Sequence, residues 1–279
     1  MKNRATVPSA VNLRRADFEC RYGQLHVRTA FPCTGGFDER TALLCLHQSP
    51  QSSRSFVPLL PELGTDRSVY ALDTPGYGES DRPIGGQALP TIADYAAAAG
   101  EVLDALRLRE VDVLGHQTGA AIAAELAIAR PAQLRRLVLV SLPVHTAQER
   151  AAFDAQPWPL PPAADGSHVL REWQRSVAAR GPGVTLGQLA AEFADKLHNG
   201  AHAHEGAWAA YHWPAAERLR LVRQPVLVLR PRDELWEATA RARPLLAGAE
   251  WHELPDHGAG LFGVAPAPIA ARIRKFLDR

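Results

Sequence analysis

The stretch Val111-Asp112-Val113-Leu114-Gly115-His116-Gln117-Thr118-Gly119 decides the fold. Its first four residues are mostly apolar and predict a short buried strand, and the small-residue run 120–129 that follows predicts a helix. Gly115 and Gly119 bracket the connection, as a tight turn requires where backbones approach closely and leave no room for Cβ atoms. The sequence therefore predicts a strand, a sharp turn and a helix that present the side chain of Gln117 at the end of a strand.

This arrangement is typical of a nucleophile elbow, in which one side chain stands at the top of a sheet. The central position normally holds Ser, Asp or Cys, because covalent catalysis needs a group that attacks the substrate. An amide is not a useful nucleophile, so Gln117 indicates that the usual covalent chemistry is absent. We expect Gln117 to orient substrate or water at the floor of a pocket; the alternative is a remnant polar group bonded to loop amides.

Apolar strands alternate with helical segments through most of the chain. The expected strands are 43–46, 69–72, 111–114, 137–140, 225–229 and 251–254, and they follow a loose arm at 1–15 and a hairpin at 18–29. The expected helices are 56–63, 91–108, 120–129 and 269–277. Strands that are apolar throughout and alternate with helices predict the α/β class, with a mostly parallel sheet covered by helices on both faces.

The pattern changes between Pro143 and Arg223. Proline-rich segments, several histidines and four of the six tryptophans occur there without a clear strand. This stretch predicts a helical cap, or lid, over residues 144–220, with residues 1–143 and 221–279 forming the core. We expect the cap tryptophans mostly to pack inside the insertion, with one or two of them contacting ligand. They are Trp158, Trp173, Trp208 and Trp213.

Composition excludes several classes of partner. The chain has 279 residues, 46% of them hydrophobic, and a formal net charge of +1, so nucleic acid and acidic membrane surfaces are not expected partners. The three cysteines show no metal-ligand spacing and suit a reducing compartment. With no apolar leader at the N-terminus and no apolar run of membrane-spanning length, the expectation is a cytoplasmic protein. The sequence leaves a homodimer open.

Four segments resemble, in the same order, motifs of the α/β-hydrolase superfamily, specifically small cap-bearing members of the epoxide-hydrolase, haloalkane-dehalogenase and C–C-hydrolase type. His47-Gln48-Ser49-Pro50 is similar to the H-G-x-P loop, and 73–80 is similar to the D-x-x-G-x-G-x-S loop. The elbow at 115–119 is the third segment, and 254–262 resembles the loop of the catalytic histidine. The resemblance implies an α/β-hydrolase fold over residues 16–279.

The resemblance also implies positions for the site residues. The backbone amides of Ser49 and Thr118 correspond to an oxyanion hole, and Asp233 corresponds to the acid that orients the catalytic histidine. Two positions depart from the family in addition to the elbow, because Gln48 replaces a glycine and Ala259 stands where the family has its histidine. The triad is therefore degenerate.

A histidine, His257, lies two residues before the altered family position. It is a candidate for a displaced general acid or base, and a surface loop histidine is the alternative. Asp233 is a candidate to orient this ring, or to cap the helix expected near Trp236. His116 and His47 are candidates to line the pocket, although packing and loop-shaping roles are the more common ones for histidines at these positions.

Four further histidines gather in the expected cap: His198, His202, His204 and His212. The first and second are spaced i, i+4, which a metal site on a helix would need. No H-E-x-x-H signature accompanies them and no cysteine joins them, so histidines lining a polar pocket are preferred over metal ligands. No metal and no cofactor is expected.

The sequence supports two classes of function. The first is an enzyme that acts on a small, partly apolar organic molecule by non-covalent hydrolysis, lyase or proton-transfer chemistry, with Gln117, His257 and Asp233 as catalytic residues. The second is a non-catalytic protein that binds a small ligand on a hydrolase scaffold. A further alternative is an engineered inactive variant of an α/β hydrolase, because one substitution at the elbow is enough to stop turnover.

Overall fold

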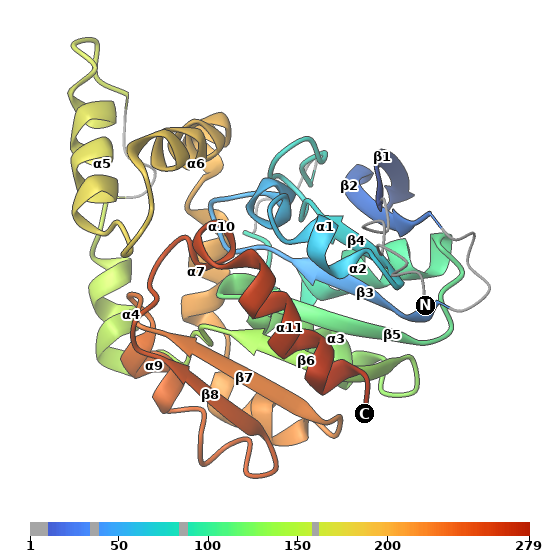
Figure 1. The fold of residues 1–279 in the computed structure, drawn as a ribbon. Helices are drawn as coiled ribbons and strands as arrows, with labels where there is room; N and C mark the ends of the chain where they lie inside the picture. The colour runs from blue at the N-terminus through green and yellow to red at the C-terminus, as the bar shows by residue number, and fades with distance from the viewer. Residues whose placement is uncertain (1–10, 34–38, 84–88, 158–161) are drawn as a thin grey trace.

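The computed structural model describes residues 11–33, 39–83, 89–157 and 162–279. Its centre is an eight-stranded sheet in the order β1-β2-β4-β3-β5-β6-β7-β8 (Figure 1). The strands are β1 (Val11–Cys20), β2 (Gly23–Pro32), β3 (Arg40–Leu46), β4 (Arg67–Leu72), β5 (Val111–His116), β6 (Leu134–Val140), β7 (Val226–Pro231) and β8 (Glu250–Leu254). From β4 to β8 all neighbours are parallel, and only β1 and β2 run antiparallel to their partners. The predicted α/β class with a mostly parallel sheet is confirmed.

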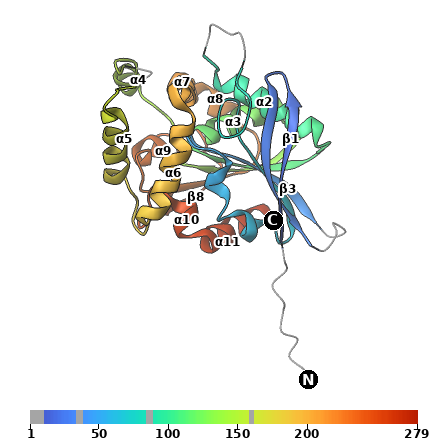
Figure 2. The same ribbon diagram turned by 90° about the horizontal axis from the view of Figure 1, so that it is seen from above.

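Helices cover both faces of the sheet, as Figure 2 shows along its edge. One face carries α2 (Ile92–Ala105) and α3 (Thr118–Ala129), and the other carries α1 (Leu60–Leu63), α10 (Leu261–Val264) and α11 (Pro266–Leu277). All six residues of β5 are buried because both faces of this central strand are covered. Helix α3 is rich in alanine, and these small side chains allow it to pack closely against the sheet.

The described residues between β6 and β7 form five α-helices. They are α4 (Ala147–Asp154), α5 (Ser167–Ala178), α6 (Leu186–His198), α7 (Glu205–His212) and α8 (Ala215–Arg218). Figure 1 shows α5 and α6 well away from the sheet, with α4 and α7 nearer to it. The described part of this segment contains no strand, as its sequence predicts. Trp158 lies outside the described residues.

Two expected element bounds are wrong. Residues 11–15 were expected to belong to a loose arm, but they form half of β1 and pair with the far end of β2. Arg14 and Arg15 obscured this strand, because an edge strand can carry charged side chains on its exposed positions. The expected helix at 56–63 is broken into a 3₁₀ turn (Ser53–Phe56) and the short α1, since Pro58 cannot donate a helical hydrogen bond.

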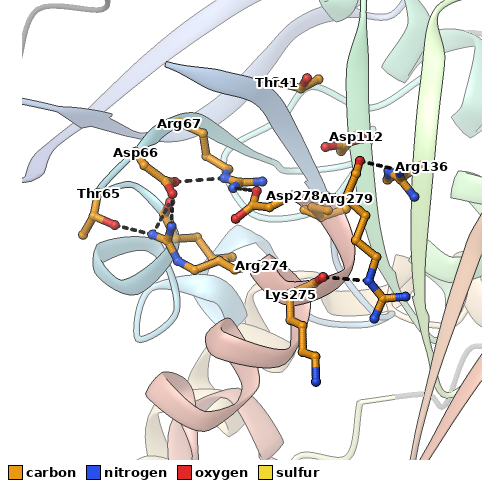
Figure 3. A network of polar contacts seen from close by, with 12 residues as sticks. Thr41, Thr65, Asp66, Arg67, Asp112, Arg136, Arg274, Lys275, Asp278 and Arg279 are labelled. Atoms are coloured by element: carbon orange, nitrogen blue, oxygen red, sulfur yellow. Dashed lines mark hydrogen bonds and ion pairs between the residues drawn. The ribbon is translucent and has the colours of Figure 1, made fainter. Parts of the chain in front are cut away.

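The amino ends of the parallel strands are tied to the C-terminal helix by charged groups (Figure 3). Arg67 at the start of β4 is fully buried and forms ion pairs with Asp66, at 3.0 Å, and with Asp278. Arg274 on α11 pairs with Asp66 as well and donates to the carbonyl oxygen of Glu62 at 2.6 Å. The network fixes α11 against the sheet at the edge opposite to the elbow.

Candidate functional site

Gln117 occupies a strained turn between β5 and α3. Its backbone has φ 50° and ψ −114°, a combination that a residue with a Cβ adopts only where the surroundings enforce it. A Cβ at Gly119 would overlap the carbonyl oxygen of Leu46, and a Cβ at Gly115 would overlap that of Gly119. Both glycines are therefore required by close backbone approach, and the turn presents Gln117 at the carboxyl edge of the sheet.

The side-chain amide of Gln117 is held by two neighbouring carboxylates. Its Nε2 donates to Oε1 of Glu234 at 2.7 Å, and the amide lies close enough to Asp233 to act against the rise in the pKa of that carboxyl. An NH₂ group supplies two donors, so one amide is able to serve both acids. The Oε1 atom of Gln117 has no partner within the described parts of the chain and stays free to accept a hydrogen bond from water or substrate.

Asp233 is the more buried member of this acid pair. Burial raises its pKa to about 6, and the nearby charge of Glu234 acts in the same direction. Hydrogen bonds from Ser141 Oγ at 2.6 Å, from the backbone N–H of Leu235 at 3.0 Å and from Gln117 oppose this rise. The acid pair is thus arranged to exchange a proton close to neutral pH.

His257 does not reach this pair. One oxygen of Asp233 accepts from Ser141 and the other from the N–H of Leu235, the residue before helix α9 (Trp236–Ala240). The N-cap of α9 is Leu235 and no side chain caps the helix, so the capping alternative for Asp233 is wrong. The Nδ1 atom of His257 is buried without a partner among the described residues, and the ring does not line the cavity. The hydrogen bond expected between Asp233 and His257 is therefore not formed in the structure.

The backbone of the histidine loop explains this placement. The carbonyl oxygen of His257 accepts from Arg232 N–H at 2.6 Å, which fixes the residue against the end of β7. Two residues later, Ala259 and Gly260 line the cavity. The position at which the family carries its histidine faces the site, and the chain has a methyl group there.

His47 and His116 are buried, neutral rings that shape the loops around the elbow. Nε2 of His47 accepts from Thr74 N–H at 3.0 Å, so its Nδ1 carries the proton and donates to the Gln48 carbonyl oxygen at 2.9 Å. His116 donates from Nδ1 to Oε1 of Gln48 at 3.0 Å. Burial lowers the pKa of both, in His116 to about 3, so neither ring is a proton acceptor near neutral pH. Gln48 links the two rings.

The oxyanion-hole candidates lie at the same place. Ser49 lines the cavity next to Gln48, and Thr118 follows Gln117 as the first residue of α3. The N–H groups in the first turn of a helix have no partner within the helix, so the amide of Thr118 is available to a ligand. The structure thus brings together Gln117, Gln48, Ser49, His116 and Thr118, with Asp233 behind Gln117.

A cavity of ≈ 320 Å³ opens above Gln117. Its walls come from the elbow, from the loop after β3, from helices α5 and α6, and from the loops after β7 and β8. Apolar contacts come from Val184, Leu189 and Phe193, and charged groups from Arg175, Arg180, Lys196, Glu172, Glu192 and Glu234. Lys196 pairs with Glu172 across α5 and α6. The cavity therefore suits a small molecule with both apolar and polar parts.

The helices over the cavity are fixed to the core by polar contacts. Ser52 donates to both oxygens of Asp195 on α6, at 2.9 and 2.8 Å, and Asn199 donates to the carbonyl oxygen of Pro50 at 2.6 Å. Glu125 on α3 binds Arg218 at the end of the segment. These contacts hold the end of α6 and the end of α8 against the rest of the molecule.

The histidines between β6 and β7 have other partners. His202 bonds to Glu205 at 2.8 Å and to Arg82, also at 2.8 Å, while His212 stacks on Trp208. Within residues 11–33, 39–83, 89–157 and 162–279, no group of three or more His, Cys, Asp or Glu side chains is placed to hold a metal ion. None of the described helices is both long and apolar enough to cross a membrane. Trp173 packs on Phe193, which lines the cavity.

Sequence reasoning missed Glu234. The residue follows Asp233 directly, and the family resemblance assigns a role only to the first acid of this loop, Asp233. The available signal was the pair of adjacent carboxylates after a buried strand, at the edge where the elbow also ends. Two neighbouring acids at such an edge are a candidate for proton transfer, because the charge of Glu234 raises the pKa of Asp233.

Known proteins with similar sequences and folds include several hydrolases. A 2-hydroxymuconate semialdehyde hydrolase from Pseudomonas sp. (strain CF600) is 41% identical over 83 residues, which cover 29% of this chain and 28% of that protein. A 1-acylglycerol-3-phosphate O-acyltransferase, ABHD5, from Rattus norvegicus is 28% identical over 50% of this chain and 37% of its own length. The chain thus matches less than half the length of these curated relatives.

The fold comparison covers nearly the whole chain. The esterase RhEst1 from Rhodococcus sp. ECU1013 superposes with a TM-score of 0.76 over 95% of this chain and 98% of that one, at 22% identity. The family model described as the alpha/beta hydrolase fold matches residues 41–199, which is more than half of the chain. The chain belongs to the α/β-hydrolase fold family.

Proposed function

We propose that the protein is an enzyme that acts on a small, partly apolar organic molecule by hydrolysis, lyase or proton-transfer chemistry without a covalent intermediate. The observation that carries this proposal is the amide of Gln117, held at the elbow by the carboxylates of Glu234 and Asp233 beneath a cavity. The chain keeps the strained turn of the elbow, and an acid from the loop after β7 hydrogen bonds to the side chain that this turn presents. The hydrolases among its relatives support a reaction of hydrolase type.

For a carbonyl substrate, the N–H groups of Ser49 and Thr118 polarise the carbonyl oxygen. Oε1 of Gln117 accepts a hydrogen bond from a water molecule, and Glu234, which lines the cavity, removes a proton from it. The water oxygen bonds to the carbonyl carbon, and the same proton returns to the leaving group as its bond breaks. Gln117 never forms a bond to the substrate, because its nitrogen lone pair is delocalised.

Asp233 acts as a positioning residue in this scheme. It does not line the cavity, but it hydrogen bonds to Gln117 and places a second negative charge beside Glu234. That charge favours proton uptake by the pair, and the hydrogen bond fixes the amide. The acid pair accepts a proton from water in the form in which Asp233 is ionised, so activity should increase as Asp233 ionises.

Residues 144–220 are proposed to serve as the cap. Helix α6 supplies Leu189 and Phe193, and the loop between α5 and α6 supplies Val184. These apolar side chains suit the apolar part of a substrate. The charged groups Arg175 and Arg180 stand on the same side. The core is then residues 1–143 and 221–279, which carry the elbow and the acid pair. A cytoplasmic location and a homodimer stay predictions.

The experiment joins a ligand screen to product analysis. Small esters, lactones and C–C-cleavable dienoates are tested by thermal shift and by product formation with the wild type. Glu234→Gln should then lower turnover by about 10²–10⁴-fold, the range for a lost acid–base group. Glu237→Gln is the matched control, because this exposed acid three residues further on has no contact with Gln117. Equal turnover in wild type and Glu234→Gln would contradict the proposal.

A second experiment tests the absence of a covalent step. A fluorophosphonate probe should leave the elbow unlabelled in intact-mass analysis, because Gln117 has no group that attacks phosphorus. Stoichiometric labelling within residues 115–119 would contradict the non-covalent scheme.

The second candidate function is a non-catalytic binding protein. The observation in its favour is that the elbow holds an amide and the family's histidine position holds Ala259, while the cavity remains. Ligands that raise the melting temperature without conversion by any variant would support this function. An engineered inactive variant predicts instead that Gln117→Ser alone restores fast ester hydrolysis.

A further inference from the structure

A second cavity of ≈ 370 Å³ lies beside the first and has residues in common with it. Gln51, Val184, Glu192 and Gly260 line both cavities. The remaining wall comes from β2, from the turn Ser53–Phe56 and the residues after it, and from the outer part of α6. Val57, Pro58 and Ala191 give this wall an apolar part.

The polar part of the second cavity is dominated by arginine. Arg28 on β2 and Arg54 both line it. Arg15 on β1 lies directly opposite Arg28 in the antiparallel register, so a third cation stands next to the cavity. Like charges directly opposite each other on adjacent strands are destabilising. The fold therefore gathers three cations in one place, and of these Arg54 has carboxylate partners in Glu79 and Asp195.

Arg28 lacks the partners that a half-buried guanidinium normally has. Its Nε is buried without a hydrogen bond, and across the described ranges no carboxylate lies within ion-pair distance of it. Burial lowers the pKa of Arg28 and the charge of Arg54 adds to this effect, whereas the charges of Asp73 and Asp195 oppose it without forming an ion pair with Arg28. The hydroxyl of Ser55, another residue of this wall, is also buried without a partner. Two donors of one cavity are thus left unsatisfied.

The acids nearby do not neutralise Arg28. Asp195 lines the cavity but accepts two hydrogen bonds from Ser52 and lies 3.4 Å from Arg54. Arg54 pairs with Glu79 as well, at 2.8 Å. Glu192 faces both cavities, and burial together with the charge of Asp195 raises its pKa. Among the described residues of this wall, Arg28 is the cation without an ion pair, so it is available to an incoming anion.

We infer that the second cavity is a binding site for a carboxylate, with Arg28 as its charged ligand and the hydroxyl of Ser55 as an additional donor. The apolar wall accepts the carbon skeleton that carries the carboxylate. Because the two cavities have four residues in common, one ligand of sufficient length places its carboxylate near Arg28 and its reactive group near Gln117. This last step rests on the proposed function, whereas carboxylate binding by itself does not.

The test uses benzoate and its neutral analogue benzamide, with isothermal titration calorimetry as the readout. Benzoate should bind the wild type with a Kd of about 1 mM or tighter, and benzamide at least about tenfold more weakly. Arg28→Met should weaken benzoate binding by at least about tenfold, because a charge-assisted hydrogen bond is lost. Ser55→Ala should weaken it by a smaller factor.

Two control variants place the site. Arg15→Met removes the exposed cation of the same strand pair and should leave the benzoate Kd within about threefold of wild type, because Arg15 does not line the cavity. Arg180→Met removes a cation of the first cavity and should behave in the same way. Melting of ligand-free Arg28→Met should occur at or above the wild-type temperature, since a desolvated, unpaired charge is removed.

The proposal is overturned if benzoate fails to bind, if benzamide binds as well, or if Arg180→Met abolishes binding while Arg28→Met does not. Because calorimetry needs no turnover, a failure of the proposed chemistry leaves this test intact. Loss of benzoate binding in Arg28→Met, with normal melting and unchanged binding in Arg15→Met, supports the site.

Discussion

Charged groups at the two ends of the parallel strands are arranged in opposite ways. At the amino ends, the buried Arg67 is paired with Asp66 and Asp278, so opposite charges offset each other's loss of hydration. At the carboxyl ends, Asp233 and Glu234 are adjacent acids and their hydrogen bonds come from neutral donors: Ser141 and the Leu235 N–H for Asp233, and the amide of Gln117 for Glu234. The first arrangement fixes α11 to the sheet, whereas the second keeps two like charges together.

Charges that stabilise the fold and charges suited to proton transfer therefore lie at opposite ends of the same strands. A paired buried charge resists change, because removal of either partner leaves the other desolvated. Two like charges beside a cavity raise the pKa of one of them toward neutral pH, which lowers stability and makes a proton acceptor available. The predictions that follow break each arrangement in turn.

The largest effect is expected at the amino ends. Arg67→Met leaves Asp66 and Asp278 without their buried partner and should lower the free energy of unfolding by about 3 kcal/mol, as measured by urea denaturation. Arg272→Met on the exposed face of α11 is the control and should change it by less than about 0.5 kcal/mol. A decrease in the free energy of unfolding below about 1 kcal/mol for Arg67→Met would show that this charged network does not stabilise the fold in the way described.

The next effect concerns the carboxyl ends. Gln117→Ser alone should not give efficient ester hydrolysis, because a serine needs a base within about 2.6–3.2 Å. The double variant Gln117→Ser, Ala259→His should exceed either single variant by roughly 10²-fold, since members of a triad act as a unit. Hydrolysis of an activated ester by the two single variants and the double variant measures this. If the serine variant equals the double variant, the ring of His257 already reaches the elbow.

A smaller effect follows from the pKa of Asp233, which is raised to about 6. Between about pH 4, where an unfolded Asp titrates, and pH 6, the native carboxyl binds more protons than the unfolded one, so stability decreases as the pH rises. Asp233→Asn removes this penalty and should unfold with a free energy on the order of 2 kcal/mol higher at pH 8. The gain should vanish below about pH 4. A destabilised variant at pH 8 would contradict the strain attributed to the acid pair.

Most of the fold could be predicted from the sequence, because periodicity and turn residues are local signals. The apolar strands, the glycines of the elbow and the strand-free segment after β6 all follow from residue types and their spacing. The first half of β1 could not be predicted, since its arginines are accommodated only by the pairing with β2. Pro58 is a local signal for the break in this helix, but the apolar spacing around it favoured one continuous helix.

The site was less predictable, because a side chain's direction depends on contacts that are distant in sequence. Gln117, Ser49, Gln48 and His116 line one cavity and Thr118 follows Gln117 in the chain, because strand ends fix their loops; their roles stay predictions. The ring of His257 could not be placed, because the hydrogen bond from the Arg232 N–H to the His257 backbone sets its position. The acid Glu234 could not be placed, because the turn at the start of α9 sets its direction. The catalytic role of His257 stays a prediction.

The central claim is that protons are transferred by the Asp233–Glu234 pair and not by His257. A pH profile of the wild type alone cannot separate them, since an ordinary histidine titrates near 6.5 and Asp233 has a pKa of about 6. The decisive measurement is the pH dependence of kcat/KM for His257→Gln beside the wild type, on a substrate found in the screen. We predict that the variant keeps the increase in activity with a midpoint near pH 6 and loses less than about fivefold in rate. Loss of that increase, or a decrease of about 10² or more, would contradict the account and assign the proton to His257.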